Sequence, residues 1–235
     1  MLPKINHPTF HIKIPSTGKK CLFRQFLVRE EKILLMAKAS EDPADVFRAV
    51  KQVVNNCAVD DSFDVDKLAM FDLEYLFLKL RALSVSNVIN VTYRDNEDEK
   101  TYDFSINLDE VEVKFPEGVE KVIKINETTG VVMKYPVANL LDDREFLQSG
   151  EDSFYELIVR CIDKIYNGED VYDSSTVDKD ELETFLDDLD IKVFEKIQNF
   201  MASVPKLYHK IEYKNSNGND RVIELNTLTD FFTLG

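Results

Sequence analysis

The sequence predicts an α+β protein that combines a helical core with antiparallel hairpins. Three observations predict it. Residues 71–85 have the composition of a helix but are apolar on nearly every side, and residues 88–135 alternate with the period of two that is typical of strands. Helical periodicity occurs on both sides of the strand region. The predicted architecture is a long, nearly all-apolar central helix, an N-terminal hairpin, a central antiparallel sheet region and a C-terminal hairpin.

The beginning of the chain predicts a hairpin followed by two helices. Residues 9–28 alternate around a turn at Pro15 to Gly18, as expected for two antiparallel strands. Residues 28–39 and 40–57 then change to a helical pattern. In the second of these helices the apolar positions share one face: Val46, Phe47, Val50, Val53, Val54 and Cys57.

Residues 68–83 are predicted to form the central helix of the helical core. An amphipathic helix of a soluble protein carries an apolar stripe about 100° wide, but here the apolar residues surround the axis. Such a helix must be buried on nearly every side, either within this chain or partly against a partner. The side chains expected in the core are Phe71, Leu73, Leu76, Phe77 and Leu80.

Strands and further helices make up the rest of the chain. Strand-like runs separated by polar or glycine-containing turns predict an antiparallel region over residues 88–135. Asp178 and Glu181 have the spacing of a capping box at the start of a helix. The sequence does not decide whether this helix bends near Asp190. Residues 206–225 predict a closing hairpin. Helical patterns lie between the two strand regions, over residues 137–148, 153–166 and 178–204.

By pattern the chain divides into three segments, which we expect to form one compact unit. These are the N-terminal hairpin and helical core at residues 1–87, the strand region at 88–135, and the helices and C-terminal hairpin at 136–235. A chain of 235 residues with 44% apolar content is long enough to bury a substantial core.

Charge and composition restrict the classes of function. The net charge of −15 argues against nucleic-acid binding, because affinity for a polyanion comes largely from neutralised phosphates. Residues 1–59 carry 10 basic and 5 acidic side chains, a net of +5, whereas residues 141–190 carry 4 and 17, a net of −13. The acidic segment is either a solvated surface or a face that steers a basic partner. No apolar run is long enough to span a membrane and the first ten residues lack a signal-peptide pattern, so we expect a cytoplasmic protein.

The sequence offers no motif for catalysis, cofactor binding or metal binding. The seven glycines form neither a phosphate-binding loop nor a nucleophile elbow. Cys21, Cys57 and Cys161 are isolated from one another, which predicts reduced thiols rather than a disulfide framework or a zinc ribbon. The three histidines lack ligand spacing. We therefore predict no enzyme activity, no cofactor and no metal, although carboxylate pairs for glycoside hydrolysis meet in space and cannot be judged by spacing.

Two predicted hairpin tips are alike in length. Eight polar residues lie between Tyr93 and Tyr102, and eight lie between Tyr213 and Val222. These tips are either two solvent-exposed turns or a repeated functional unit.

Two segments carry a resemblance to a known family. "FRQFLVREEKILLMA" at Phe23–Ala37 and "FDLEYLFLKLRALSV" at Phe71–Val85 resemble, in order and spacing, the baseplate hub assembly proteins of T4-like bacteriophages. The similarity continues more weakly through "SINLDEVEV" and "IELNTLTDFF". Some members of that family carry cysteine pairs near the two hairpin tips, where this chain has "RDNEDEK" and "KNSNGND". The resemblance thus implies that hydrogen bonds and turn residues, rather than a metal, hold these tips.

The resemblance also implies a function. It implies a non-enzymatic morphogenesis protein that assists assembly of the central hub of a contractile-tail baseplate. A permanent minor structural component of the hub is the alternative, and a hub-associated hydrolase is a remote one. The implied partners are baseplate hub proteins, with no nucleic acid and no membrane. The implied location is the host cytoplasm during assembly, with the virion baseplate as a second possibility.

The end of the chain is a candidate for partner binding. Phe231, Phe232 and Leu234 place large apolar side chains at a terminus, where residues are usually loose unless something holds them. Either they close the protein's own core beside the last hairpin, or they contribute to a contact with a hub subunit.

Overall fold

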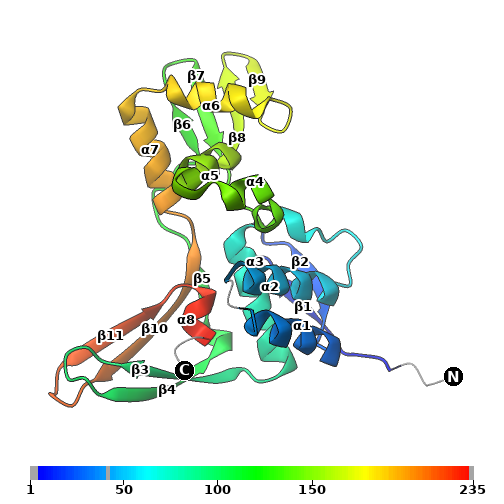
Figure 1. The fold of residues 1–235 in the computed structure, drawn as a ribbon, viewed down its shortest axis with the longest axis vertical. Helices are drawn as coiled ribbons and strands as arrows, with labels where there is room; N and C mark the ends of the chain where they lie inside the picture. Colours follow the sequence, from blue (N-terminus) through cyan, green and yellow to red (C-terminus); the bar gives the residue numbers. More distant parts are fainter. Residues whose placement is uncertain (1–4, 41–42, 233–235) are drawn as a thin grey trace. The chain divides into compact units, whose positions relative to one another are not determined.

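The computed structural model describes residues 5–40 and 43–232. Contacts divide the chain into two compact units (Figure 1). Unit 1 comprises Met1–Lys114 and Lys206–Gly235, and unit 2 comprises Phe115–Pro205. The three segments predicted from sequence follow pattern rather than contacts, and that division stays a prediction.

Unit 1 consists of helices and three small antiparallel sheets. Its helices are α1 (Val28–Lys38), α2 (Pro43–Cys57), α3 (Met70–Ser84) and α8 (Leu228–Phe232). Its strands are β1 (Thr9–Lys13), β2 (Lys20–Arg24), β3 (Val88–Arg94), β4 (Thr101–Asn107), β5 (Glu112–Lys114), β10 (Lys206–Lys214) and β11 (Asp220–Leu225). The sheets pair β1 with β2, β3 with β4, and β10 with both β11 and β5.

The predicted first hairpin is confirmed. Ile12 on β1 pairs with Cys21 on β2, and both side chains are buried together with Phe23. The connecting turn has Gly18 at φ +71°, in the left-handed region that glycine adopts without steric cost. Its backbone is held from α3, because the buried carboxylate of Asp72 accepts hydrogen bonds from the N–H of Ser16 at 2.9 Å and from the Ser16 hydroxyl.

The prediction of a long, nearly all-apolar central helix is wrong. Helix α3 has 15 residues, and its side chains include Asp72, Glu74, Lys79 and Arg81. The half-buried Lys79 ammonium group donates to the carbonyl oxygens of Leu108 and Asp109, so the helix needs polar side chains on that side. Among the described helices, none is both long and apolar.

The apolar side of α3 is nevertheless covered by its own chain. The helix packs against α2, β5, β10 and the 3₁₀-helix at Leu108–Glu110. Phe26 and Phe77 place their ring centroids 5.8 Å apart. The five side chains expected in the core are all buried: Phe71, Leu73, Leu76, Phe77 and Leu80. A partner is therefore not needed to bury this helix.

The strand region predicted at residues 88–135 does not form one sheet. Strands β3 and β4 pair with each other, with Tyr93 opposite Tyr102, whereas β5 joins the closing hairpin by pairing Leu207 with Val113. The remaining strands of the region belong to unit 2. Alternation identifies strands, but it does not identify the partner of each strand.

Unit 2 is a four-stranded antiparallel sheet with helices. The strand order is β6-β7-β8-β9. Its strands are β6 (Val122–Lys124), β7 (Thr129–Met133), β8 (Ile162–Asn167) and β9 (Asp170–Asp173). Its helices are α4 (Arg144–Gln148), α5 (Ser153–Cys161), α6 (Lys179–Asp187) and α7 (Ile191–Ala202).

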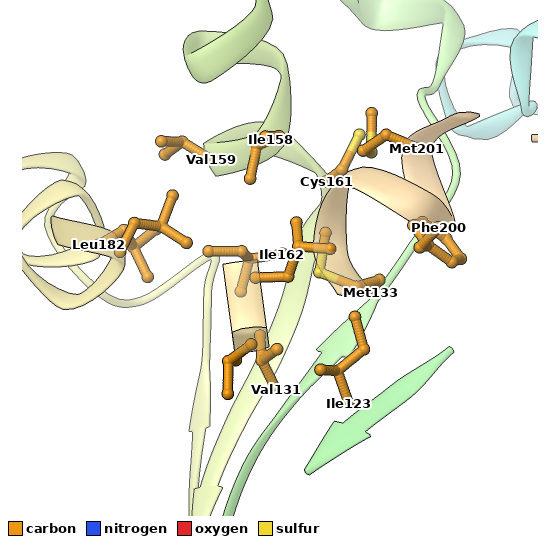
Figure 2. Close-up of a cluster of buried hydrophobic side chains, with 13 residues drawn as sticks. Ile123, Val131, Met133, Ile158, Val159, Cys161, Ile162, Leu182, Phe200 and Met201 are labelled. Carbon is orange, nitrogen blue, oxygen red and sulfur yellow. The ribbon is translucent and has the colours of Figure 1, made fainter. Parts of the chain in front are cut away.

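The core of unit 2 lies between this sheet and its helices. Figure 2 shows Ile123, Val131 and Met133 from the strands turned toward Ile158 of α5 and Phe200 of α7. Tyr135 stacks on Phe200 with ring centroids 5.6 Å apart. A sheet with one face packed on helices in this way closes an apolar core within the unit.

The structure shortens one predicted helix of unit 2 and settles the open bend in another. The helix predicted over 153–166 ends at Cys161, and Ile162 and Ile165 lie on β8, paired with β7. The helical pattern over 178–204, for which a bend near Asp190 was open, forms two helices, α6 and α7. Asp190 begins the second by accepting a hydrogen bond from the N–H of Val193 at 3.0 Å, as an N-cap does.

Candidate interaction surface and hairpin-tip network

Helix α1 leaves large apolar side chains in solvent. Val28, Leu35 and Met36 are 75%, 58% and 75% exposed, whereas Glu30 and Ala37 on the opposite side are buried. The exposed residues are seven and eight positions apart, so they share one side of the helix. Single exposed apolar residues are ordinary, but three on one short helix face indicate a contact surface.

A groove lies beside the exposed side of α1. Its volume is about 470 Å³, and Leu34, Phe47 and Phe77 line it from three helices of unit 1. The remaining lining residues are Phe26, Glu31, Ala37, Lys38, Val46, Val50, Arg81, Val85, Leu228 and Thr229. Most of these side chains are apolar, so the groove can bury apolar groups of a ligand. We call the groove together with Val28, Leu35 and Met36 the α1 surface.

A buried ion pair fixes α1 from behind. The carboxylate of Glu30 accepts from Arg24 Nη1 at 3.0 Å and Nη2 at 2.9 Å, and it also accepts from the N–H of Leu27 at 2.9 Å. Burial raises the pKa of Glu30, but the hydrogen bonds from Arg24, Leu27 and Arg29 lower it overall. Arg24 also donates to the carbonyl oxygen of Asn56 at 2.7 Å. The α1 surface therefore rests on a rigid support, which favours defined binding.

Two exposed lysines flank the apolar side chains of α1. Lys32 and Lys38 are exposed on α1 and form no ion pair among the described residues. These two uncompensated ammonium groups favour a partner with acidic groups.

The two hairpin tips of unit 1 contact each other. The β3–β4 and β10–β11 hairpins lie side by side (Figure 1). Asp95, which is fully buried, accepts from the hydroxyl of Tyr213 at 2.6 Å and from Arg221 Nε at 3.1 Å. Asp98 accepts from the N–H and the hydroxyl of Ser216 at 2.9 and 2.8 Å. Most residues of both tips are exposed, as expected for solvent-exposed turns, but the two tips also contact each other.

Hydrogen bonds and aromatic contacts hold these tips together. Desolvation raises the pKa of Asp98, but hydrogen bonds from Tyr102, Lys100 and Ser216 lower it overall. Tyr102 and Phe104 pack their rings on Tyr213 with centroids 4.9 and 5.1 Å away. Within the described part of the chain, no three His, Cys, Asp or Glu side chains are grouped so that they could hold a metal ion.

The cysteines are buried thiols. Cys21, Cys57 and Cys161 are free and buried. Burial raises the pKa of Cys57 to about 11 and that of Cys161 to about 12. A thiol with a raised pKa is a poor nucleophile because little thiolate is present near neutral pH.

The predicted C-terminal site is only partly described. Phe231 is 2% exposed and therefore buried within unit 1. Phe232 ends α8, but its side chain and Leu234 lie outside the described residues. Binding of a partner by these three residues stays a prediction.

Comparison with known families gives the context of these features. A family model described as "T4 bacteriophage base plate protein" matches residues 7–233. The chain belongs to this family. The match spans both units, so the resemblance predicted from the sequence is confirmed at the level of a T4-like phage baseplate protein. The comparisons with curated proteins and with solved structures find no match.

Membership agrees with the features of the site. The family is described as one of base plate proteins, whose surroundings in the phage are other baseplate proteins. In this base plate protein, the α1 surface is the candidate for such a contact. This surface was not predicted from the sequence, because α3 has the most apolar sequence and was therefore the helix considered for contact with a partner. The available signal was the row Val28, Leu35 and Met36 in a helix that also buries its opposite side.

Proposed function

We propose that this base plate protein assists assembly of the baseplate hub without catalysing a reaction, by binding another baseplate protein through the α1 surface. The observation that carries the proposal is the uncovered apolar side of α1 in a unit that buries its other large helix, α3, within the chain. Apolar area that folding leaves in solvent is available for association.

Closed cores favour a transient assembly factor over a permanent structural component. The apolar side chains of α3 and the core of unit 2 are buried within the chain. Subunits of obligate assemblies commonly bury large apolar interfaces that resemble a divided core. A protein that folds alone and presents one limited apolar surface can bind and leave, as an assembly factor does. The alternative, a permanent minor component of the hub, requires that this protein stay in the particle.

The experiment compares baseplate assembly with and without a functional α1 surface. A phage lacking this gene is complemented with the wild-type chain, with Leu35→Asp/Met36→Asp, or with Val171→Asp. The last is the control, because Val171 is an equally exposed apolar residue (62%) on β9 of unit 2. We expect the α1 double variant to fold with an unchanged Tm but to yield few completed baseplates by sedimentation and electron microscopy. Normal baseplates with this variant would contradict the proposal.

Mass spectrometry of purified virions distinguishes the two roles. A transient factor is absent from virions or present far below the stoichiometry of baseplate proteins. A constant number of copies per virion would establish the structural alternative instead. The isolated protein should also be monodisperse and unfold cooperatively, since each unit closes its own core.

A further inference from the structure

The groove and the exposed residues of α1 form one continuous surface. Glu31 and Lys38 line the groove, and Leu35 lies four positions after the first and three positions before the second. Residues three and four apart are neighbours on a helix. Leu35 therefore lies next to the groove residues on α1. Val28 lies on the same side of the helix, seven residues before Leu35.

Two apolar residues from the other helices of the groove are also accessible. Val46 of α2 and Val85 at the end of α3 both line the groove and are both exposed. Exposed apolar side chains therefore line the groove from more than one helix. The buried side chains of Phe26 and Val50 also line it. A ligand with several apolar groups in a row can contact all of them.

An amphipathic helix fits such a surface. Grooves between helices bind helices that present apolar residues at positions i, i+3 or i+4, and i+7. The charged groups that line the groove, Glu31, Lys38 and Arg81, belong to long side chains that can keep their charged ends at the border of a bound helix. A small-molecule site normally has a few convergent polar groups inside the pocket, whereas this lining is mainly apolar.

The charges of α1 argue against a second copy of this chain. Lys32 lies between Val28 and Met36 on the exposed side of α1. In a twofold contact only a residue on the axis meets its own counterpart, and in a contact centred on this side that residue is Lys32, near the middle of α1. Two Lys32 ammonium groups would then approach each other, and each copy carries a net charge of −15. Both features disfavour self-association.

The same charges favour an acidic partner. Lys32 and Lys38 have exposed side chains beside the apolar row, and neither forms an ion pair among the described residues. Acidic residues that flank the apolar face of a partner helix would lie near these two lysines. Complementary charges of this kind speed encounter and fix orientation.

We propose that the α1 surface binds an amphipathic helix of another baseplate protein, whose apolar residues enter the groove and whose flanking acidic residues pair with Lys32 and Lys38. The inference rests on the proposed function, because it names the chemistry of the partner that the same surface would hold.

Site-specific photo-crosslinking tests the partner's identity. The full chain carries p-benzoylphenylalanine at Leu35 during infection, and the cross-linked peptides are identified by mass spectrometry. We expect one dominant cross-link to a helical segment of a baseplate protein that combines an apolar face with acidic flanking residues. Cross-links mainly to a second copy of this chain, or to a strand or loop of a baseplate protein, would overturn the inference. In the latter case the proposed function would still stand.

Charge reversal tests the electrostatic part. Association of the purified full chain with the cross-linked segment, made as a peptide, is measured for wild type, for Lys32→Glu/Lys38→Glu, and for the control Lys124→Glu/Lys164→Glu, which changes two exposed lysines of unit 2. We expect the α1 variant to associate about tenfold more slowly at low salt, with a smaller difference at high salt. Equal effects of both variants would show that only net charge matters and would overturn the lysine pairing. Native mass spectrometry that finds a small molecule in the groove would overturn the helix as its occupant.

Discussion

The hydroxyl of Tyr213 donates a hydrogen bond to the carboxylate of Asp95 at 2.6 Å, across 118 positions of sequence. The same carboxylate accepts from the N–H of Glu97 at 2.8 Å and from Arg221 Nε at 3.1 Å. Two hairpins that are distant in sequence thus share one buried acceptor. The tips hold each other through polar groups of their own.

Removal of the Tyr213 hydroxyl should weaken this contact. Tyr213→Phe keeps the ring that packs on Tyr102 and Phe104 but removes the donor to Asp95. We expect the free energy of unfolding to fall by about 1 kcal/mol in urea melts, the usual size of one hydrogen bond. Tyr208→Phe is the control, because its hydroxyl makes only an exposed 3.3 Å contact with Glu224 on the neighbouring strand. Equal losses for the two variants would show that the Asp95 bond adds nothing specific.

The contact between the two hairpin tips could not be predicted from the periodicity of the sequence. Alternation predicts strands and polar turns, and the structure confirms both hairpins. The hydrogen bond between Tyr213 and Asp95 forms because the fold brings two distant hairpins together. Such a long-range contact produces no spacing pattern in the sequence. The equal length of the tips was the available signal, and it fits two turns that dock on each other.

Two other differences have similar causes. Ile162 and Ile165 are three positions apart, which suits one face of a helix, yet the pairing of Ile165 with Val131 on β7 makes them part of a strand. For α1, the sequence predicted the helix but not which side is covered, because Val28, Leu35 and Met36 are as apolar as the residues that face the core. Tertiary contacts decide both cases.

A core substitution should be costly in α3. Leu76 is fully buried, so Leu76→Ala should lower the free energy of unfolding by about 2–5 kcal/mol through lost burial and a cavity. Leu83→Ala on the same helix is the matched control, since Leu83 is 41% exposed and should lose much less. Denaturant melts of the isolated protein measure both. A loss below about 1 kcal/mol for Leu76→Ala would contradict burial of α3 by its own chain.

Folding should not require a metal. The hairpin tips are held by hydrogen bonds from Tyr213 and Ser216, and the thiols are separate and buried. We expect EDTA and phenanthroline to leave the Tm unchanged, because a structural zinc would contribute to folding directly. Elemental analysis of the purified protein provides the second measurement. Stoichiometric zinc together with unfolding on chelation would refute this prediction.

The C-terminal residues should affect stability. Phe231 is buried, so deletion of residues 231–235 removes a core side chain, and loss of a buried phenylalanine typically costs about 3–5 kcal/mol. We expect a marked fall in Tm, whereas deletion of residues 233–235 leaves Phe231 in place and serves as the control. Association with hub proteins is measured separately for both. Unchanged stability with lost association would support docking by this terminus, and no change in either would refute both readings.

The attachment of α8 to α3 should depend on pH through Glu74. The carboxyl group of Glu74 lies near the backbone N–H of Leu228, the first residue of α8. Burial, followed by the charge of Asp230, raises the pKa of Glu74 to about 7 even though the Leu228 N–H lowers it. The folded state thus favours the protonated carboxyl more than the unfolded state does, where the pKa is about 4.3.

The sign of the effect follows from this difference in pKa. Stability contributed by protonated Glu74 is fully present below about pH 4.3 and is lost as the pH rises through about 7. Glu74→Gln keeps the size of the side chain but cannot ionise. We therefore expect it to raise the free energy of unfolding at pH 8 by on the order of 1–3 kcal/mol and to flatten the decline between pH 5 and pH 8. Glu195→Gln on the exposed side of α7 changes the net charge equally and should leave the decline in place. Urea melts across this pH range measure the three proteins. A wild-type decline that persists unchanged in Glu74→Gln would show that another group causes it.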